Sequence, residues 1–183
     1  MKIYILAAIF SIMFTGCHDY TNADLDQRVP FGRHLDHNFK SVGSSDRDDL
    51  ERYQWLKEDT LFSKINVDVT NDGKIVTVSQ IKDFSNSSDA REFFDYARNQ
   101  LSNKNGSMTC RTEFVTPDQP VFTNTTCSLY DKANRKIELS EMLTQTGYLS
   151  AYANRYLPLF LLRPVSTLFS DSSSYVSIQY KND

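Results

Sequence analysis

The sequence has little histidine and little glycine: three histidines and six glycines occur among its 183 residues. The histidines are His18, His34 and His37, and all three precede the part of the chain that we expect to fold. A Ser-His-Asp or Cys-His mechanism needs an imidazole that packing holds beside its nucleophile, so this distribution argues against both. The sequence also lacks a G-x-S-x-G nucleophile elbow and a glycine-rich phosphate loop.

Neither metal ligands nor basic patches stand out in the sequence. His34 and His37 lie in a polar stretch without a fixed third ligand, and such pairs bind metal weakly. We therefore expect neither a metal nor a cofactor. The 20 Lys and Arg residues are outnumbered by 23 Asp and Glu, which gives a net charge of −3. We expect no nucleic-acid partner, because phosphate backbones are bound by basic surfaces.

One long apolar run occurs, and it lies near the start of the chain. Lys2 precedes an unbroken apolar stretch over residues 3–14, and Thr15, Gly16 and Cys17 follow it. About a dozen apolar residues are too few to cross a bilayer as a helix, which takes ~20, but they match the core of a secretory signal. The longest later apolar cluster, residues 157–162, is shorter and contains a proline, so we expect no other anchor.

The residues at the end of this run, Phe14-Thr15-Gly16-Cys17, are similar to the lipobox of bacterial lipoproteins. The resemblance implies that residues 1–16 are removed as a signal peptide and that the Cys17 sulfur carries diacylglycerol, with fatty acids such as palmitate. Two or more acyl chains hold a protein stably on a membrane, because each buried methylene contributes roughly 0.8 kcal/mol. The alternative is an ordinary secretory signal followed by an incidental cysteine.

The residue after the lipidated cysteine bears on which membrane carries the protein. In the lipoproteins that this leader resembles, an aspartate at that position favours the inner membrane of enteric-type bacteria. Here the position is His18, so the resemblance implies a lipid-anchored protein of the bacterial cell envelope, with the outer membrane favoured over the inner one. Asp19 follows directly, and a Gram-positive cell has no outer membrane.

Apart from the cysteine of the leader, two cysteines remain, Cys110 and Cys127. Residues 109–115 and 121–130 are rich in β-branched and aromatic side chains and flank a turn-forming segment, 117–120, which predicts a hairpin. A hairpin centred on that segment places Cys110 opposite Cys127, close enough for a disulfide. Disulfides persist in the compartments that exported proteins enter, so we predict this bond rather than a metal or redox pair.

After removal of the leader, the chain has the length of one domain. Residues 17–44 are polar, contain Pro30 and several Gly, Asp and Asn, and show neither helical nor strand periodicity. We expect this stretch to be a lipidated N-terminus followed by a flexible tether. The folded, periplasm-facing domain is then expected over residues 45–183.

The apolar pattern of that domain predicts helices interleaved with strands. Alternating residues around an Asn71-Asp72-Gly73 turn predict a hairpin over residues 65–78. Together these elements indicate an α+β fold with a mainly antiparallel sheet, about three helices and one disulfide-braced hairpin. Helices are expected over residues 45–58, 87–101 and 140–156, and further strands over residues 136–139 and 174–180.

Aromatic residues gather near the end of the third expected helix and just beyond it. Patches rich in tyrosine with an arginine nearby are common at protein interfaces, although core packing is the more frequent fate of such residues. The candidate partner-binding residues are Tyr148, Tyr152, Tyr156, Phe160 and Arg163.

These features predict a non-catalytic, lipid-anchored protein whose domain binds another envelope or secreted protein. It could be an immunity-type lipoprotein that caps a toxic effector, or an accessory factor for secretion or surface assembly. The alternative is a hydrolase of cell wall or lipid, because two carboxylates suffice for glycoside hydrolysis. Its candidate residues, each more simply explained as a solvated strand residue or a charge at a helix start, are Glu113, Glu138 and Glu141.

Overall fold

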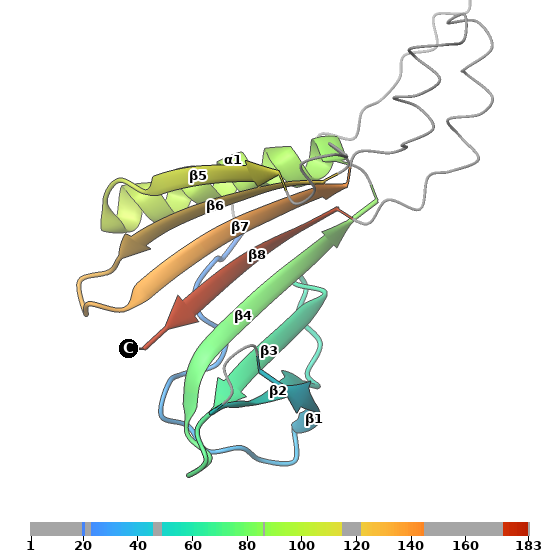
Figure 1. Cartoon of the computed structure of the whole chain (residues 1–183), viewed down its shortest axis with the longest axis vertical. Coiled ribbons are helices and arrows are strands. Elements are labelled where there is room, and N and C mark those ends of the chain that lie inside the picture. The colour runs from blue at the N-terminus through green and yellow to red at the C-terminus, as the bar shows by residue number, and fades with distance from the viewer. Residues whose placement is uncertain are drawn as a thin grey trace, which may run out of the picture.

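A computed structural model of the chain describes residues 20, 23–45, 49–85, 87–114, 122–144 and 174–182. In these residues, eight strands form one antiparallel sheet and one helix covers part of one face (Figure 1). The expected α+β domain with about three helices is therefore wrong. The strands are β1 (Phe39–Ser44), β2 (Glu51–Trp55), β3 (Lys64–Val69), β4 (Ile75–Phe84), β5 (Thr109–Phe114), β6 (Phe122–Tyr130), β7 (Lys136–Thr144) and β8 (Ser174–Lys181), and the helix is α1 (Ser87–Asn105).

The strands lie in the order β1-β2-β3-β4-β8-β7-β6-β5, and every neighbouring pair is antiparallel. Strands β1 to β4 therefore form one meander and β5 to β7 another. The last strand, β8, lies between β4 and β7 and joins the two meanders into one strongly twisted sheet (Figure 1).

Two hairpins agree with the sequence prediction. Strands β3 and β4 pair around the Asn71-Asp72-Gly73 turn, where Gly73 has a φ of 79° that glycine adopts without strain. Strands β5 and β6 pair with Cys110 directly opposite Cys127, and the two sulfurs are bonded. The predicted disulfide and its register are therefore confirmed.

Helix α1 begins at Ser87, as predicted, and continues to Asn105, a turn beyond the expected end. Its buried residues recur at helical spacing and pack against β4, β6, β7 and β8. None of the described residues forms a helix that is both long and apolar enough to cross a membrane. The residues of α1 that face the sheet are Ala90, Phe93, Phe94, Ala97 and Leu101.

The first and third expected helices are not observed. Residues 51–55 form β2, where Tyr53 packs against the core and Arg52 pairs with Asp68 on the opposite face, as the two-residue period of a strand requires. The predicted helix over residues 140–156 fails at its start, because residues 140–144 continue β7. The remainder of that range lies outside the described residues.

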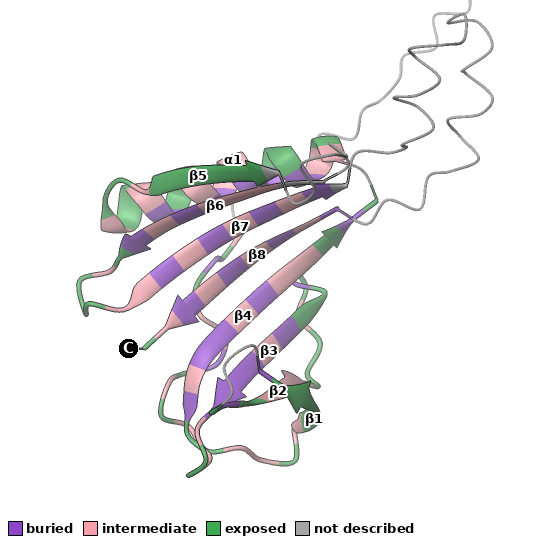
Figure 2. Ribbon diagram, in the orientation of Figure 1, coloured by how far each residue is buried: buried purple, intermediate pink, exposed green. Residues whose placement is uncertain are grey.

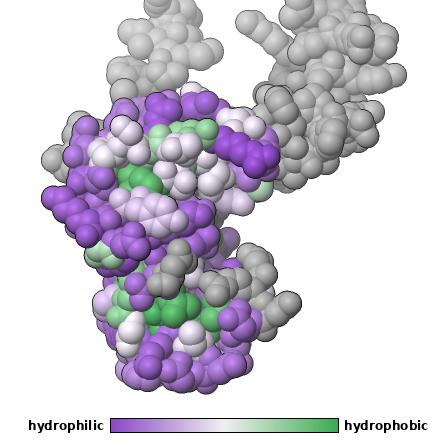
Figure 3. Space-filling view, turned by 60° about the vertical axis from the view of Figure 1, so that its left-hand side comes forward, coloured by the Kyte–Doolittle hydropathy of each residue, from purple (hydrophilic) through white to green (hydrophobic). Residues whose placement is uncertain are grey.

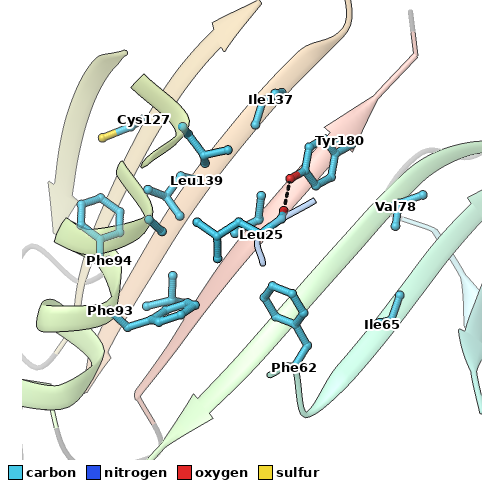
Figure 4. Packing of buried hydrophobic residues seen from close by; sticks show 14 of the residues in the cluster. Leu25, Phe62, Ile65, Val78, Phe93, Phe94, Cys127, Ile137, Leu139 and Tyr180 are labelled. Atoms are coloured by element: carbon cyan, nitrogen blue, oxygen red, sulfur yellow. Dashed lines mark hydrogen bonds between the residues drawn. The ribbon is translucent and has the colours of Figure 1, made fainter. Parts of the chain in front are cut away.

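The segment that was expected to be a flexible tether is part of the fold from residue 23 onward. Leu25 and Val29 are 7% and 0% exposed and belong to the main apolar core. Figure 4 shows Leu25 between Phe93 of α1 and Tyr180 of β8. Residues 39–44 form the edge strand β1. The prediction of a tether over residues 17–44 is therefore wrong for residues 23–44, because these apolar side chains complete the core.

The two faces of the sheet differ in character. Along β8, residues that face α1 are buried and those between them are half-buried (Figure 2). We call the face away from α1 the open face. It is polar: Glu138 forms ion pairs with Lys136 and Lys181, and the Gln179 amide donates a hydrogen bond of 2.9 Å to Ser79.

Candidate functional site

A groove lies where the segment of residues 23–31 runs beside the C-terminal half of α1. Its larger hollow, of about 530 Å³, is bounded by this segment, the end of α1, the β6–β7 turn and the neighbouring ends of β7 and β8. A second hollow of about 420 Å³ adjoins it, since both share three lining residues. We call the two hollows the α1 groove, and its main lining residues are Asp26, Phe31, Leu101, Lys104, Asp131 and Arg135.

Arg28 fixes the segment that forms one wall of the groove. Its backbone N–H donates a 2.6 Å hydrogen bond to the side-chain oxygen of Gln80, which is fully buried in β4. Its guanidinium donates to Asp59 at 2.8 Å and lies over the Phe62 ring, 5.5 Å from the centroid. Both charged side chains of this pair are mostly buried, so the wall is held by the core of the domain rather than by surface contacts.

The lining of the groove combines apolar side chains with charges of both signs. Phe31, Leu101 and Ile137 supply the apolar part. The Arg135 guanidinium lies over the Phe31 ring, 5.8 Å from the centroid, and carries positive charge to the edge of this apolar surface. Asp26 and Lys104 form an exposed ion pair on the boundary that the two hollows share.

Asp131 is held as a carboxylate by the β6–β7 turn. Its oxygens accept hydrogen bonds from the N–H groups of Ala133 and Arg135 at 2.8 and 2.9 Å and from the Arg135 guanidinium at 2.8 Å. Burial alone would raise the pKa of Asp131, but these hydrogen bonds and the Arg135 charge lower it. A general acid needs a raised pKa, so the lowered pKa does not suit Asp131 to donating a proton.

The three carboxylates considered for a hydrolase do not share a cleft. Glu113 is exposed on β5. Glu138 lies on the open face, where burial would raise its pKa but Lys136 and Lys181 lower it. Glu141 lies on the opposite face of β7 and is fully buried. No pair of these carboxylates therefore supplies the two facing acids that glycoside hydrolysis requires.

Glu141 lies near α1, where Arg91 is its counter-ion. The Arg91 Nε atom is 2.9 Å from a Glu141 oxygen, and Arg91 itself is half-exposed. The approach is poorly directed, so neither carboxylate oxygen receives a well-formed hydrogen bond. Burial raises the pKa of Glu141, although the Arg91 charge opposes this effect. Arg91 covers the carboxylate and leaves it no open approach for a substrate.

The other residues singled out in the sequence are distributed as follows. The disulfide of Cys110 and Cys127 fastens edge strand β5 to β6. His34 forms a backbone bridge with Lys74, and within the described ranges no three His, Cys, Asp or Glu side chains are grouped to hold a metal ion. The lipidation site and the aromatic candidates lie outside the described residues; these are Cys17, Tyr148, Tyr152, Tyr156, Phe160 and Arg163.

Apolar side chains are not spread evenly over the surface. Figure 3 shows hydrophilic residues over most of the part that holds α1 and β5 to β7, and apolar residues gathered lower, where β1 to β3 lie. The exposed large apolar side chains among the described residues are Val42, Leu56 and Tyr130, which are 48%, 54% and 55% exposed. Single exposed apolar side chains are common on protein surfaces, so they assign no function by themselves.

No protein-family model, curated protein or solved structure matches the chain. The residues of the α1 groove could not be predicted from the sequence as a site. They come from three segments that are far apart in the chain and share no local pattern. The function therefore has to be inferred from the chemistry of these residues and from the leader.

Proposed function

We propose that this protein is a lipid-anchored component of the bacterial cell envelope whose domain binds another protein through the α1 groove. In this proposal residues 1–16 direct export, Cys17 carries the lipid, and the outer membrane is the favoured location. The lipobox-like leader supports the anchor. The disulfide between Cys110 and Cys127 supports an oxidising compartment, because such bonds persist outside the cytoplasm.

The observation that carries the binding role is the composition of the α1 groove. Protein interfaces combine an apolar centre with a polar and charged rim. Phe31 supplies partly exposed apolar surface beside the buried Leu101, and the pairs Asp26–Lys104 and Asp131–Arg135 place both charge signs next to it. The matching partner is a protein segment that inserts an apolar side chain and carries acidic and basic residues on either side of it.

Two biological roles fit this binding chemistry. An immunity-type protein would cap a toxic effector delivered to the envelope, and an accessory factor would hold a component of a secretion or surface assembly. Both roles require a membrane-attached domain with a binding surface, and neither requires catalysis. They differ in the partner, so capture and identification of that partner decides between them.

An affinity pull-down from envelope extract tests the proposal, with the processed protein as bait and its disulfide intact. Exchange of the ion pair, Asp26→Lys together with Lys104→Asp, keeps the pair but reverses the charges that a partner meets. We expect the unaltered protein to retain a specific partner and the exchanged protein to retain at least tenfold less. Lys57→Glu, which changes an exposed lysine outside the groove, serves as the matched control and should retain the partner fully.

The outcomes separate the parts of the proposal. Capture of no protein by the unaltered bait would contradict the binding role, and equal capture by the exchanged protein would move the site away from the α1 groove. Mass spectrometry of the same bait tests the anchor, since Cys17 must carry diacylglycerol. Thermal unfolding of each variant shows whether a loss of capture reflects a loss of folding.

A further inference from the structure

Tyr20 is packed onto the flank of α1 three positions after Cys17. Its ring meets the Phe93 ring edge-on, with 5.1 Å between centroids, and lies 6.0 Å from the Tyr96 ring. The Lys82 ammonium lies 5.9 Å from the centroid of the same ring. These contacts fix the position of Tyr20 on the folded domain.

The described residues that follow, from Ala23 onward, are also bound to the domain. Leu25 and Val29 are buried in the core, and Arg28 is bonded to Gln80 and Asp59. A lipid on Cys17 is therefore joined to the placed residue Tyr20 through only three residues of chain, which we call the leash. Three residues span about 10 Å at full extension, whereas the tether expected from the sequence would reach roughly 30 Å as a flexible coil.

We propose that the lipid on Cys17 holds the domain directly against the membrane, with the Tyr20 flank of α1 turned toward the lipid surface. The inference rests on the proposed function in one respect, namely that Cys17 is lipidated. It adds a defined orientation, because a leash of about 10 Å is shorter than the domain and ends at one fixed point on it.

The structure gives the direction in which the domain extends from this point. The Phe84 ring, at the end of β4, is 5.6 Å from the Phe93 ring, so this end of β4 lies near the leash. The ten residues of β4 span roughly 30 Å, which places the β3–β4 turn with Asn71 at the far end. Lys104 lies about 16 Å along α1 from Phe93, so the end of the α1 groove at the Asp26–Lys104 pair lies away from the anchor, whereas its Ala23 end adjoins Tyr20.

The charges near Tyr20 indicate that lipid attachment, rather than charge, brings this flank to the membrane. Burial raises the pKa of Tyr20, and the nearby carboxylates of Asp89 and Glu92 raise it further. Arg91 on the same helix is paired with Glu141. Anionic lipids attract clusters of basic residues, whereas the described basic residues near Tyr20 are Lys82, at its ring, and Arg91, which is paired with Glu141.

The orientation can be measured on the full processed protein in vesicles of phosphatidylethanolamine and phosphatidylglycerol. A genetically encoded fluorescent residue replaces either Glu92, which is exposed beside Tyr20, or Asn71 in the β3–β4 turn. The lipid headgroups carry an acceptor for resonance energy transfer. The characteristic distance of this donor–acceptor pair is shorter than the length of β4. We expect the donor at position 92 to be quenched several-fold more than the donor at position 71. Equal quenching at the two positions would overturn the proposal.

A longer leash provides the matched control. Twenty Gly and Ser residues inserted between Asp19 and Tyr20 leave every described contact in place but extend the leash by roughly 25 Å. The difference between positions 92 and 71 should then disappear, and its persistence would show that something other than the leash orients the domain. Mass spectrometry of the same sample separates the two proposals: an unmodified Cys17 refutes lipidation, whereas a lipidated Cys17 with equal quenching refutes the orientation alone.

Discussion

The Tyr180 hydroxyl donates a hydrogen bond to the backbone oxygen of Leu25, which lies 155 positions earlier in the chain (Figure 4). Both residues are buried, and burial is the main reason why the pKa of Tyr180 is raised. The bond joins the last strand to the segment that forms one wall of the α1 groove. The groove is therefore built on the core of the domain, and its shape depends on that core.

Leu25→Ala tests whether this segment belongs to the folded domain in solution. Removing a buried leucine side chain leaves a cavity, and we expect the free energy of unfolding to fall by about 2–4 kcal/mol. Urea unfolding followed by tryptophan fluorescence measures the change. Leu56→Ala removes the same atoms from a side chain that is 54% exposed and should change stability by less than about 0.5 kcal/mol. Equal effects from the two variants would mean that the segment is detached.

The disulfide between Cys110 and Cys127 should stabilise the domain by restricting the unfolded chain. The bonded residues are 17 positions apart, and a loop of this length corresponds to about 3 kcal/mol. We expect Cys110→Ala with Cys127→Ala to lower the urea midpoint accordingly. A reducing agent should lower the midpoint of the unaltered protein to a similar extent and leave the double variant unchanged. A midpoint that does not respond to reductant would contradict this role.

The buried Glu141 predicts a dependence of stability on pH. Burial raises the pKa of Glu141 in the folded state, so the folded protein binds this proton more readily than the unfolded chain does. The associated stability is fully present below the unfolded pKa of about 4.5 and is lost as the pH rises through the folded value. Arg91→Ala removes the counter-ion and should lower the free energy of unfolding by about 2 kcal/mol at pH 7, but by less at pH 4.

Glu141→Gln supplies the control for this effect. A neutral side chain of the same size removes the ionisable group, so Arg91→Ala made in that background should cost less at pH 7 than it does alone. Chemical unfolding of the four proteins at both pH values gives the coupling between the two residues. An equal loss at both pH values would show that Arg91 acts through packing alone.

Asp59 is expected to contribute to the loss of stability in acid. Burial would raise the pKa of Asp59, but the N–H groups of Leu61 and Phe62 and the Arg28 guanidinium lower it. The stability that this carboxylate contributes is present above its unfolded pKa, about 3.8, and is lost as the pH falls through the folded value. Asp59→Asn keeps an oxygen for the two N–H groups and should cost about 1–2 kcal/mol at pH 7.

The same measurement at low pH completes this test. The difference between Asp59→Asn and the unaltered protein should shrink as the pH falls from about 3.8 through the lowered pKa of folded Asp59, because below that value both side chains are neutral. Asp83→Asn is the comparison, because Asp83 pairs with Lys64 on the surface and should contribute less than about 0.5 kcal/mol. A larger loss in Asp83→Asn than in Asp59→Asn would contradict the importance of burial.

The parts of the fold that could be predicted from the sequence are those with local signals. The Asn71-Asp72-Gly73 turn and the pair Cys110 and Cys127 each predicted a hairpin, and the apolar pattern over residues 87–101 predicted α1. The prediction of a helix at residues 51–55 was wrong because so short a stretch fits both the helical and the strand period. Leu50, Tyr53 and Leu56 have helical spacing, while Tyr53 and Trp55 also alternate with polar residues. Pairing with β1 and β3 decided in favour of the strand.

The candidate site could not be predicted in the same way. Leu25 and Val29 are isolated apolar residues in a polar stretch, and their burial depends on contacts with parts of the chain that are remote in sequence. The groove then brings Asp26, Lys104 and Asp131 together across the N-terminal segment, α1 and the β6–β7 turn. These positions are set by tertiary packing, on which local periodicity carries no information.

The position of β8 between β4 and β7 also determines when the sheet can be completed during synthesis. Until residue 181 has been synthesised, β4 and β7 have no strand between them, and the unfinished sheet consists of two ribbons with open edges. Folding that depends on such distant pairing is slow to nucleate. If the chain is exported as we propose, this delay favours export. A polypeptide that cannot finish folding until β8 has been synthesised remains unfolded and can pass through a translocation channel.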